Sequence, residues 1–510
     1  MIGLLASIAL VTYLGVRWYK SAFQRPGKNF PPGPPSLPIY GAYWIVLWRQ
    51  ANNLAGSLRK LALDYKTGVV GMYLGNFPTI VIDDPKLIKE VLNNPDFDGR
   101  VDVIVARLRS FWKKLGIFFT DGYFWHVQRR FSLRYMRDFG FGRREESLEE
   151  VMANDTKEMI DMVVNGPKND AEKKIVNNGC IYMPHYFAAP FINGMVHVFT
   201  RTSLPRSQYP VMWELARNTL LFQRGTNDFG GALSLTPWLK DVMPKYSGYT
   251  NLRKGNQALL DFFTRHINDA KKTQEDSHDR HFLDAYIRQM KEEARKGGRS
   301  TFSEEQLKMI CVDYMVPAAT AVQSMLTILV ERLLIQPEIQ DKIHEEIDRV
   351  VGRDRLPTLD DRKDMPYTEA CLREIMRVEA LVALSVPHRT VKDTKVAGYD
   401  IPENTIVAFN LPTLHHDKEL WGDPENFRPE RFITNGQLDL SKDKSLPFGA
   451  GKRLCAGETF ARQGMFQVFA GFMQAFKLST VDGKPRKLAP RIQGFILSIP
   501  EFWVKVTPRN

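Results

Sequence analysis

The sequence predicts a mainly α-helical protein with a minor β-sheet region, and three observations lead to this expectation. Over most of the 510-residue chain the apolar residues recur at helical spacing, with proline or glycine at the breaks. One such segment, Tyr314–Val330, contains no charged residue. Strand-like patterns are confined to a few short stretches. Length alone favours roughly two to four domains, and no internal repeat occurs.

The N-terminal residues 1–20 are expected to form a membrane signal anchor. Met1–Val16 carries no charge, and Arg17, Lys20 and Arg25 follow. A cleavable signal peptide has its positive charges before the apolar run, whereas here they come after it. The sixteen uncharged residues are slightly fewer than the ~20 that span a bilayer. The positive charges that follow them are expected to keep the bulk of the chain on the cytoplasmic side.

Residues 21–40 are expected to form a basic, proline-rich hinge, and residues 41–510 the body. Pro31-Pro32-Gly33-Pro34-Pro35 cannot continue a helix and acts as a stiff spacer. In the body, Val69–Leu74 and Thr79–Asp83 flank Gly75-Asn76 and predict a β-hairpin. Val396–Tyr399 and Thr405–Phe409 predict a second short strand pair.

A long central helix is expected to begin after Ser303. Ser303 is a good N-cap with Gln306 three residues later, and Phe302 can pack against Leu307. The uncharged run of this helix could suggest a transmembrane span, but it contains proline, threonine, glutamine and serine. A helix that crosses the core of a large domain fits better.

The composition excludes several classes of protein. Apolar residues make up 44% of the chain and charged residues 25%, as in ordinary globular proteins. Four scattered cysteines provide neither a disulfide framework nor a zinc-site spacing, which fits a reducing compartment. The net charge of +12 is dispersed, and fits a solvated basic surface or attraction to an anionic membrane or acidic partner. Nucleic-acid binding is not expected, because no basic block with interleaved aromatic residues occurs.

A decapeptide near the C-terminus carries the strongest functional signal. It reads Phe448-Gly-Ala-Gly451-Lys-Arg453-Leu-Cys455-Ala-Gly457, and a helix is expected directly after it, over Glu458 to Phe476. Unpaired N–H groups and the dipole at a helix N-terminus favour a thiolate. The glycines allow the backbone to approach a large flat group, and the arginine supplies a permanent cation. These features suit an iron porphyrin, which takes an axial thiolate and whose propionates need cations. A buried structural cysteine is the alternative.

The pattern F-x-x-G-x-R-x-C-x-G resembles the haem-ligand loop of the cytochrome P-450 family. The resemblance implies the cytochrome P-450 fold, with heme b (iron protoporphyrin IX) between the long central helix and the cysteine loop, and one catalytic domain over 41–510. It implies Cys455 as the axial iron ligand, with Phe448, Arg453 and Gly457 at the cofactor.

Further matches to the family lie elsewhere in the chain. Trp125 and Arg129 have W-x-x-x-R spacing and, by resemblance, contact a haem propionate. Arg100 and His388 match further propionate partners of the microsomal subgroup. The sequence from Gly116 to Gly142 also resembles members of the microsomal subgroup. We expect this chain to be an arthropod member of that subgroup.

A structural group of charges is also implied by the resemblance. Glu374 and Arg377 share a helix face through i,i+3 spacing, and most such pairs are solvent-exposed. In the resembled family this pair binds the arginine of a P-E-R-F segment, here Arg431, and helps to hold the haem-loop region.

The central helix departs from the family pattern. Monooxygenases of the family carry A-G-x-(D/E)-T-(T/S) there, and the acid and threonine deliver protons for O–O bond cleavage. Here Ala318 replaces the glycine, Thr320 the acid and Ala321 the threonine, while Pro317 removes a backbone N–H. Thr320 either serves as the hydroxyl donor or only bonds back to a helix carbonyl.

The resemblance implies a haem-thiolate monooxygenase that inserts one oxygen atom from O₂ into a lipophilic substrate. Its electron donor would be NADPH-cytochrome P-450 reductase, and cytochrome b5 is a further candidate partner. The enzyme would lie at the endoplasmic reticulum membrane. A reductase-independent isomerase or dehydratase and a non-catalytic haem protein that binds a lipophilic ligand stay open. By resemblance the pocket is lined from Arg100–Phe118, Leu220–Leu239, the central helix, Leu381–Val386 and Gly494–Ile496. No polar residue there marks a particular substrate, and hormone synthesis and detoxification are both open.

Overall fold

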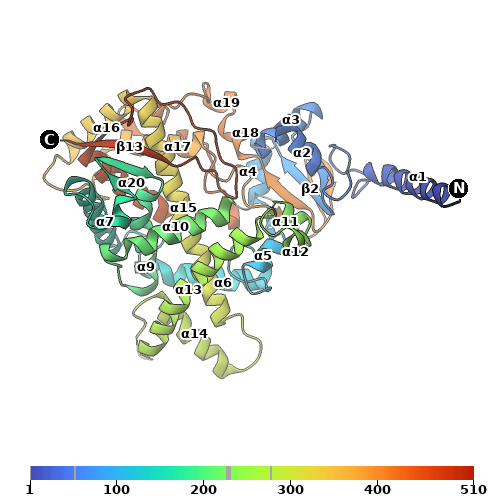
Figure 1. Cartoon of the computed structure of the whole chain (residues 1–510), viewed down its shortest axis with the longest axis horizontal. Helices are drawn as coiled ribbons and strands as arrows, with labels where there is room; N and C mark the ends of the chain where they lie inside the picture. Colours follow the sequence, from blue (N-terminus) through green and yellow to red (C-terminus); the bar gives the residue numbers. More distant parts are fainter. Residues whose placement is uncertain (1, 51–52, 225–230, 276–277, 510) are drawn as a thin grey trace.

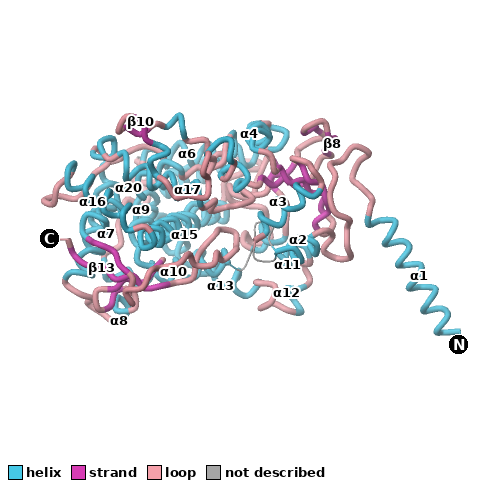
Figure 2. The backbone as a smooth tube through the Cα atoms, turned by 90° about the horizontal axis from the view of Figure 1, so that it is seen from above, coloured by secondary structure: helices cyan, strands magenta, loops and turns pink. Residues whose placement is uncertain are grey.

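A computed structural model describes residues 2–50, 53–224, 231–275 and 278–509. It contains a large helical part, a smaller part with a β-sheet on the N-terminal side, and a helix α1 (Ile2–Ala22) that projects from the body (Figure 1). Figure 2 shows α1 pointing away from the body in a second view. The mainly α-helical class with a minor sheet region is confirmed.

The remaining α-helices of the described residues follow in chain order. They are α2 (Tyr43–Gln50), α3 (Leu54–Asp64), α4 (Pro85–Asn93), α5 (Ile104–Leu108), α6 (Gly122–Asp138), α7 (Glu146–Val164), α8 (Asp170–Lys173), α9 (Ala188–Thr200), α10 (Tyr209–Arg224), α11 (Gly231–Leu235), α12 (Leu239–Val242), α13 (Tyr249–Thr273), α14 (Phe282–Lys296), α15 (Glu304–Ile335), α16 (Pro337–Val350), α17 (Pro366–Val378), α18 (Leu411–His415), α19 (Lys418–Trp421) and α20 (Glu458–Ala475). Short 3₁₀ turns include η5 (Pro429–Phe432) and η7 (Gly451–Arg453).

Helix α15 forms the centre of the main core and packs against α9, α10, α13, α16, α17 and α20. Its start is as expected, since the Ser303 hydroxyl accepts the Gln306 N–H. Among the described residues α15 is the helix long and apolar enough to cross a membrane, but most of that stretch is buried inside the protein. It is therefore a core helix, as the sequence predicts.

Four sheets complete the fold of the described part of the chain. One has the order β1-β2-β9-β6-β3, from β1 (Val69–Leu74), β2 (Phe77–Ile82), β9 (Ile406–Phe409), β6 (His388–Arg389) and β3 (Gly99–Arg100). A second has the order β12-β13-β5-β4, from β12 (Phe476–Ser479), β13 (Phe502–Pro508), β5 (Cys180–Met183) and β4 (Val176–Asn177). Two hairpins pair β7 (Thr394–Val396) with β8 (Tyr399–Ile401) and β10 (Ile433–Thr434) with β11 (Gln437–Leu438).

One predicted strand pairing is confirmed and one is wrong. The hairpin of β1 and β2 has the expected turn, and Leu74 pairs with Phe77. By contrast, Val396–Tyr399 does not pair with Thr405–Phe409. The turn residues Ala397 and Gly398 both have positive φ, so the chain reverses directly after Val396 and closes a separate hairpin. Strand β9 instead pairs in parallel with β2 and antiparallel with β6.

The proline-rich segment packs against the sheet. The Gly71 N–H on β1 donates to the Pro32 carbonyl at 2.8 Å. A Cβ at Gly33 would lie 2.0 Å from the Gly71 carbonyl oxygen, so only glycine allows this approach. The segment is non-helical, as expected, and it is held to the body by main-chain contacts.

Candidate active site

A cavity of about 320 Å³ lies between the middle of α15 and the loop that precedes α20. Aliphatic and aromatic residues form most of its lining. All five segments expected at the pocket contribute, for example through Val105, Phe222, Ala318, Leu381 and Phe495. A cavity of this size with mostly apolar walls suits a lipophilic small molecule.

The cysteine loop forms one wall of this cavity. Cys455, Phe448 and Gly457 all line it. The Cys455 N–H donates to the Phe448 carbonyl at 2.9 Å, which closes the loop two residues before the N-cap of α20. The protein encloses Cys455, and its accessible surface belongs to the cavity. Burial raises the pKa of the thiol, while the Gly457 N–H and the Arg129 guanidinium lower it.

Glycine is required at position 451, but not for the expected reason, which was close approach of the backbone to a flat group. Its φ is +66°, and a Cβ there would lie 2.2 Å from the Leu92 carbonyl oxygen at the end of α4. Gly451 is therefore needed to place the loop against α4. It is not among the cavity-lining residues, whereas its neighbours Gly449 and Ala450 are.

Two arginines and a tryptophan gather beside the loop. The Arg453 guanidinium carbon lies 3.8 Å from the centre of the Trp125 ring, and that of Arg129 lies 5.6 Å from it. Arg129 also donates to the Leu454 carbonyl. Burial lowers the pKa of Arg453 to about 10, so the side chain stays charged at neutral pH. Both arginines line the cavity, whereas Trp125 is not among its lining residues.

Arg100 and His388 face each other across the β3–β6 pair and also line the cavity. Arg100 donates to the Val386 carbonyl at 3.1 Å, and His388 donates from Nδ1 to the Phe97 carbonyl at 2.8 Å. Burial and the neighbouring Arg100 hold the pKa of His388 well below its usual value, so His388 is neutral.

Two buried donors of this cluster lack partners among the described residues: Nε of Arg100 and Nε1 of Trp125. Buried polar groups are normally hydrogen-bonded, so unpaired donors indicate an acceptor. The propionates of a haem are such acceptors, and the Cys455 sulfur is the ligand that the iron needs. The residues present therefore fit a haem held by Cys455, Arg100, Arg129 and Arg453.

Of the three expected catalytic residues on the central helix, two line the cavity and one does not. Ala318 and Ala321 line the cavity, together with Pro317. Thr320 does not line it, and its hydroxyl donates to the Val316 carbonyl at 2.7 Å. Of the two roles left open by the sequence, this geometry favours the back-bonded one.

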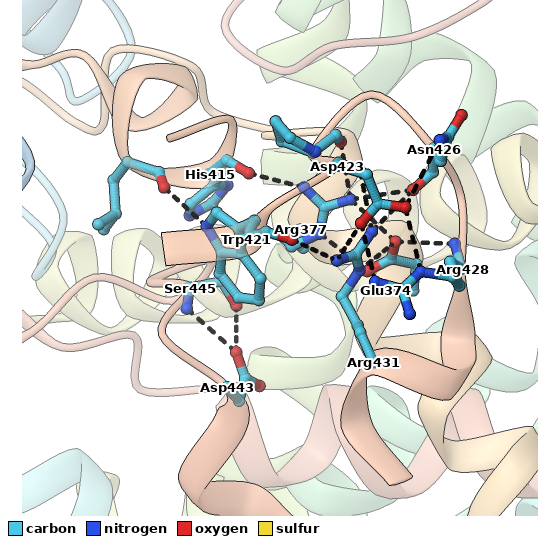
Figure 3. A network of polar contacts seen from close by, with 12 residues as sticks. Glu374, Arg377, His415, Trp421, Asp423, Asn426, Arg428, Arg431, Asp443 and Ser445 are labelled. Carbon is cyan, nitrogen blue, oxygen red and sulfur yellow. Dashed lines mark hydrogen bonds and ion pairs between the residues drawn. The ribbon is translucent and has the colours of Figure 1, made fainter. Parts of the chain in front are cut away.

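The expected charge cluster behind the cysteine loop is confirmed (Figure 3). Glu374 accepts from Nε of Arg377 at 2.8 Å and from Nε of Arg431 at 2.9 Å. These side chains are 0, 0 and 5% exposed, in contrast to a typical surface pair. Arg377 continues to the His415 carbonyl, and His415 Nε2 accepts the Leu446 N–H at 3.0 Å. The network thus reaches the start of the cysteine loop.

Sequence reasoning missed one feature of the cavity, a buried ion pair between Arg109 and Asp313. Both residues line the cavity. Asp313 is the last charge before the uncharged run of α15, which is a signal in the sequence. Its partner lies 204 residues away, so the pairing could not be read from spacing.

Comparison with known protein families and proteins agrees with this geometry. Residues 31–506 match the family model for cytochrome P450. The chain is 30% identical over 493 residues to farnesoate epoxidase of Bombyx mori, which covers 95% of each chain. It is 28% identical to a probable cytochrome P450 305a1 of Drosophila melanogaster, over 96% of each chain. It is also 28% identical to human cytochrome P450 2U1, over 99% of this chain and 94% of the relative.

The family match covers the cysteine loop, the arginine cluster and the central helix together. The curated relatives extend over almost the full length of the chain. The chain therefore belongs to the cytochrome P450 family, and is an oxidoreductase of the haem-thiolate monooxygenase type with haem b as its cofactor.

Proposed function

We propose that this enzyme hydroxylates or epoxidises a lipophilic substrate, with one oxygen atom from O₂ and electrons from NADPH. The observation that carries the proposal is Cys455 in the wall of a mostly apolar cavity, with three arginines beside it. When bound, the haem supplies O₂ activation, and the thiolate donates electron density that favours O–O cleavage. The chain's own residues hold the propionates and exclude water from the substrate.

NADPH-cytochrome P450 reductase is the proposed electron donor, with cytochrome b5 as a second candidate. The similarity to human cytochrome P450 2U1 supports a donor of the microsomal type. The similarity to a farnesoate epoxidase makes epoxidation of farnesoate one reaction to test early.

We place the enzyme at the endoplasmic reticulum membrane, with residues 1–20 as its anchor and 21–40 as the hinge. Helix α1 supports this, because Ile8, Val11 and Leu14 are each more than half exposed in the absence of a membrane. Outside α1, Trp48 on α2 is 92% exposed. We predict that deletion of residues 2–22 moves the protein from the membrane to the soluble fraction. Full retention of the deletion variant on membranes would contradict the anchor.

An isomerase or dehydratase acting on a peroxide is the second candidate, and the central helix favours it. Between Val316 and Val322 the cavity-lining residues are Val316, Pro317, Ala318, Ala321 and Val322, none of which has a polar side chain. Such enzymes need no proton relay at this position.

One experiment separates the two activities. The membrane-bound enzyme is given lipophilic substrates with NADPH and reductase, and in parallel a fatty acid hydroperoxide without reductase. Oxygenated product only in the first mixture supports the monooxygenase. Turnover of the hydroperoxide alone would overturn it. With Ala321→Thr, we expect more product per NADPH consumed, because a hydroxyl then faces the cavity.

A further inference from the structure

Asp121 is a largely buried carboxylate directly before α6, and it is not among the residues that line the cavity. It is the N-cap residue of α6, and its side chain is 19% exposed. The carboxylate of an N-cap aspartate usually accepts an N–H of its own helix. The Asp121 side chain makes no such bond, so its contacts with other parts of the chain decide what it does.

One oxygen of Asp121 joins three other segments. Oδ2 accepts the Arg100 N–H on β3 at 2.8 Å and Nη2 of Arg389 on β6 at 2.9 Å. Nζ of Lys114 lies 3.4 Å from the same oxygen. Burial alone would raise the pKa of Asp121, but the Arg100 N–H, Arg389 and Lys114 lower it below its usual value, so the carboxyl group is ionised at neutral pH. Charge-assisted hydrogen bonds to one carboxylate fix the segments that donate them relative to one another.

The segments that meet at Asp121 carry the residues expected at the haem propionates. These residues are Arg100 on β3, His388 on β6, and Trp125 and Arg129 on α6. Arg453 also reaches this junction, because its Nη2 donates at 3.0 Å to the carbonyl of Thr120, the residue before Asp121. A displacement of the Asp121 carboxylate would therefore shift several of these side chains together.

The carboxylate also offsets positive charge in the cluster. Burial lowers the pKa of Arg100 well below its usual value, and the nearby cations Arg453 and Arg129 lower it further. The carboxylates of Asp98 and Asp121 oppose this change. Both also oppose the lowering of the Arg453 pKa by burial. Asp121 thus combines a structural link between β3, β6 and α6 with a negative charge close to two of the arginines.

We propose that Asp121 is a positioning residue for the haem, whose carboxylate holds the propionate-binding segments together and offsets their positive charge. The proposal does not depend on which reaction the enzyme catalyses, because it concerns only how the chain holds haem b. Reduction of the haem adds a negative charge, which nearby negative side chains disfavour and nearby positive side chains favour. Asp121 therefore lowers the reduction potential of the haem, and Arg389 raises it.

The first test is Asp121→Asn, which keeps the size of the side chain and an oxygen for the Arg100 N–H but removes the charge. We expect haem transfer from the ferric holoenzyme to an apo-globin acceptor to be about tenfold faster, because charge-assisted hydrogen bonds are lost. In a mediated spectroelectrochemical titration, the ferrous-to-ferric ratio at a fixed potential should rise about threefold or more. An unchanged transfer rate, or an unchanged or lower ratio, overturns the proposal.

Arg389 provides a variant that restores the net charge. Arg389→Gln alone should lower the ferrous-to-ferric ratio about threefold or more. Asp121→Asn/Arg389→Gln removes one charge of each sign, so its ratio should return to within about twofold of the unmodified enzyme. A purely structural role for Asp121 would not produce opposite changes that cancel, and a double variant with the ratio of Asp121→Asn overturns the proposal. Where Asp121→Asn does not incorporate haem, Arg389→Gln is measured alone, and an unchanged ratio is the contradicting result.

Asp102→Asn is the matched control. Asp102 lies two residues after Arg100, its side chain is 42% exposed, and it pairs with the exposed Arg107. Because water screens this charge, both the transfer rate and the ratio should stay within about twofold of the unmodified enzyme. Changes in Asp102→Asn as large as those in Asp121→Asn overturn the proposal.

The ferrous–CO spectrum distinguishes this inference from the proposed function. Asp121→Asn leaves Cys455 in place, so the variant should keep a thiolate-type band. If the unmodified protein shows that band and Asp121→Asn behaves like the control, only the role of Asp121 is wrong. If the unmodified protein lacks the band, the proposed function itself is wrong.

Discussion

Glu374→Gln is expected to destabilise the region that holds the cysteine loop. Glu374, Arg377 and Arg431 are buried together, and Glu374 is the carboxylate that both guanidiniums share. The amide keeps the volume but removes the charge, and it places an N–H₂ against two cations. Loss of one partner from a buried ion network costs about 3–5 kcal/mol.

The η5 segment, which carries Arg431, offers a matched control. Glu430 pairs with Lys342 at 2.7 Å, but the two side chains are 42% and 51% exposed. Glu430→Gln removes an equal charge and should cost about 0–1 kcal/mol, because exposed pairs are screened by water.

The assay is the fraction of thiolate-type ferrous–CO absorbance that remains after equilibration in urea. Small proteins have m-values of roughly 1–3 kcal/mol per molar, and m grows with chain size. For a chain of 510 residues we take m as about 5 kcal/mol per molar, so the midpoint for Glu374→Gln should fall by about 0.6–1 M relative to the unmodified enzyme. Equal midpoints for Glu374→Gln and Glu430→Gln would show that the buried network stabilises the fold no more than an exposed ion pair does.

Three further predictions follow from the site. Trp125→Leu removes the ring that packs 3.8 Å from the Arg453 guanidinium carbon, so haem transfer to an apo-globin acceptor should be about fivefold faster or more; an unchanged rate would contradict a role for Trp125 in positioning Arg453. Thr320→Val removes a hydroxyl that bonds to Val316, so product per NADPH should stay within about twofold; a large loss would assign Thr320 to proton delivery. Burial lowers the pKa of His415 to about 3, from ~6.5 in the unfolded chain, so the folded state binds fewer protons and stability falls as pH drops from 6.5 toward 3. His415→Gln should flatten the loss of the thiolate-type spectrum between pH 7 and 5, because a neutral side chain then accepts the Leu446 N–H, and an identical pH profile would contradict this role.

Local features of the chain were predictable from sequence because their causes are local. The helix after Cys455, the Ser303 cap and the β1–β2 hairpin depend on residues within a few positions of one another. The cysteine loop was recognisable for the same reason, because its pattern spans ten residues.

Features set by distant contacts were not predictable. The need for Gly451 comes from the Leu92 carbonyl, and the partner of β9 is β2, more than three hundred residues earlier in the chain. The role of Asp313 depends on Arg109 in the same way. Thr320 shows a different limit, since a one-residue rotation on a helix decides whether a hydroxyl faces the cavity or a carbonyl.

The role of Cys455 is best tested by the ferrous–CO spectrum of the membrane-bound protein and of Cys455→Ala. We expect a red-shifted, thiolate-type Soret band in the unmodified protein, obtained with NADPH and reductase as well as with dithionite, and its loss in Cys455→Ala. A thiolate-type band that persists in Cys455→Ala would contradict the assignment of Cys455 as the iron ligand. A band obtained with dithionite alone would contradict the proposed electron supply.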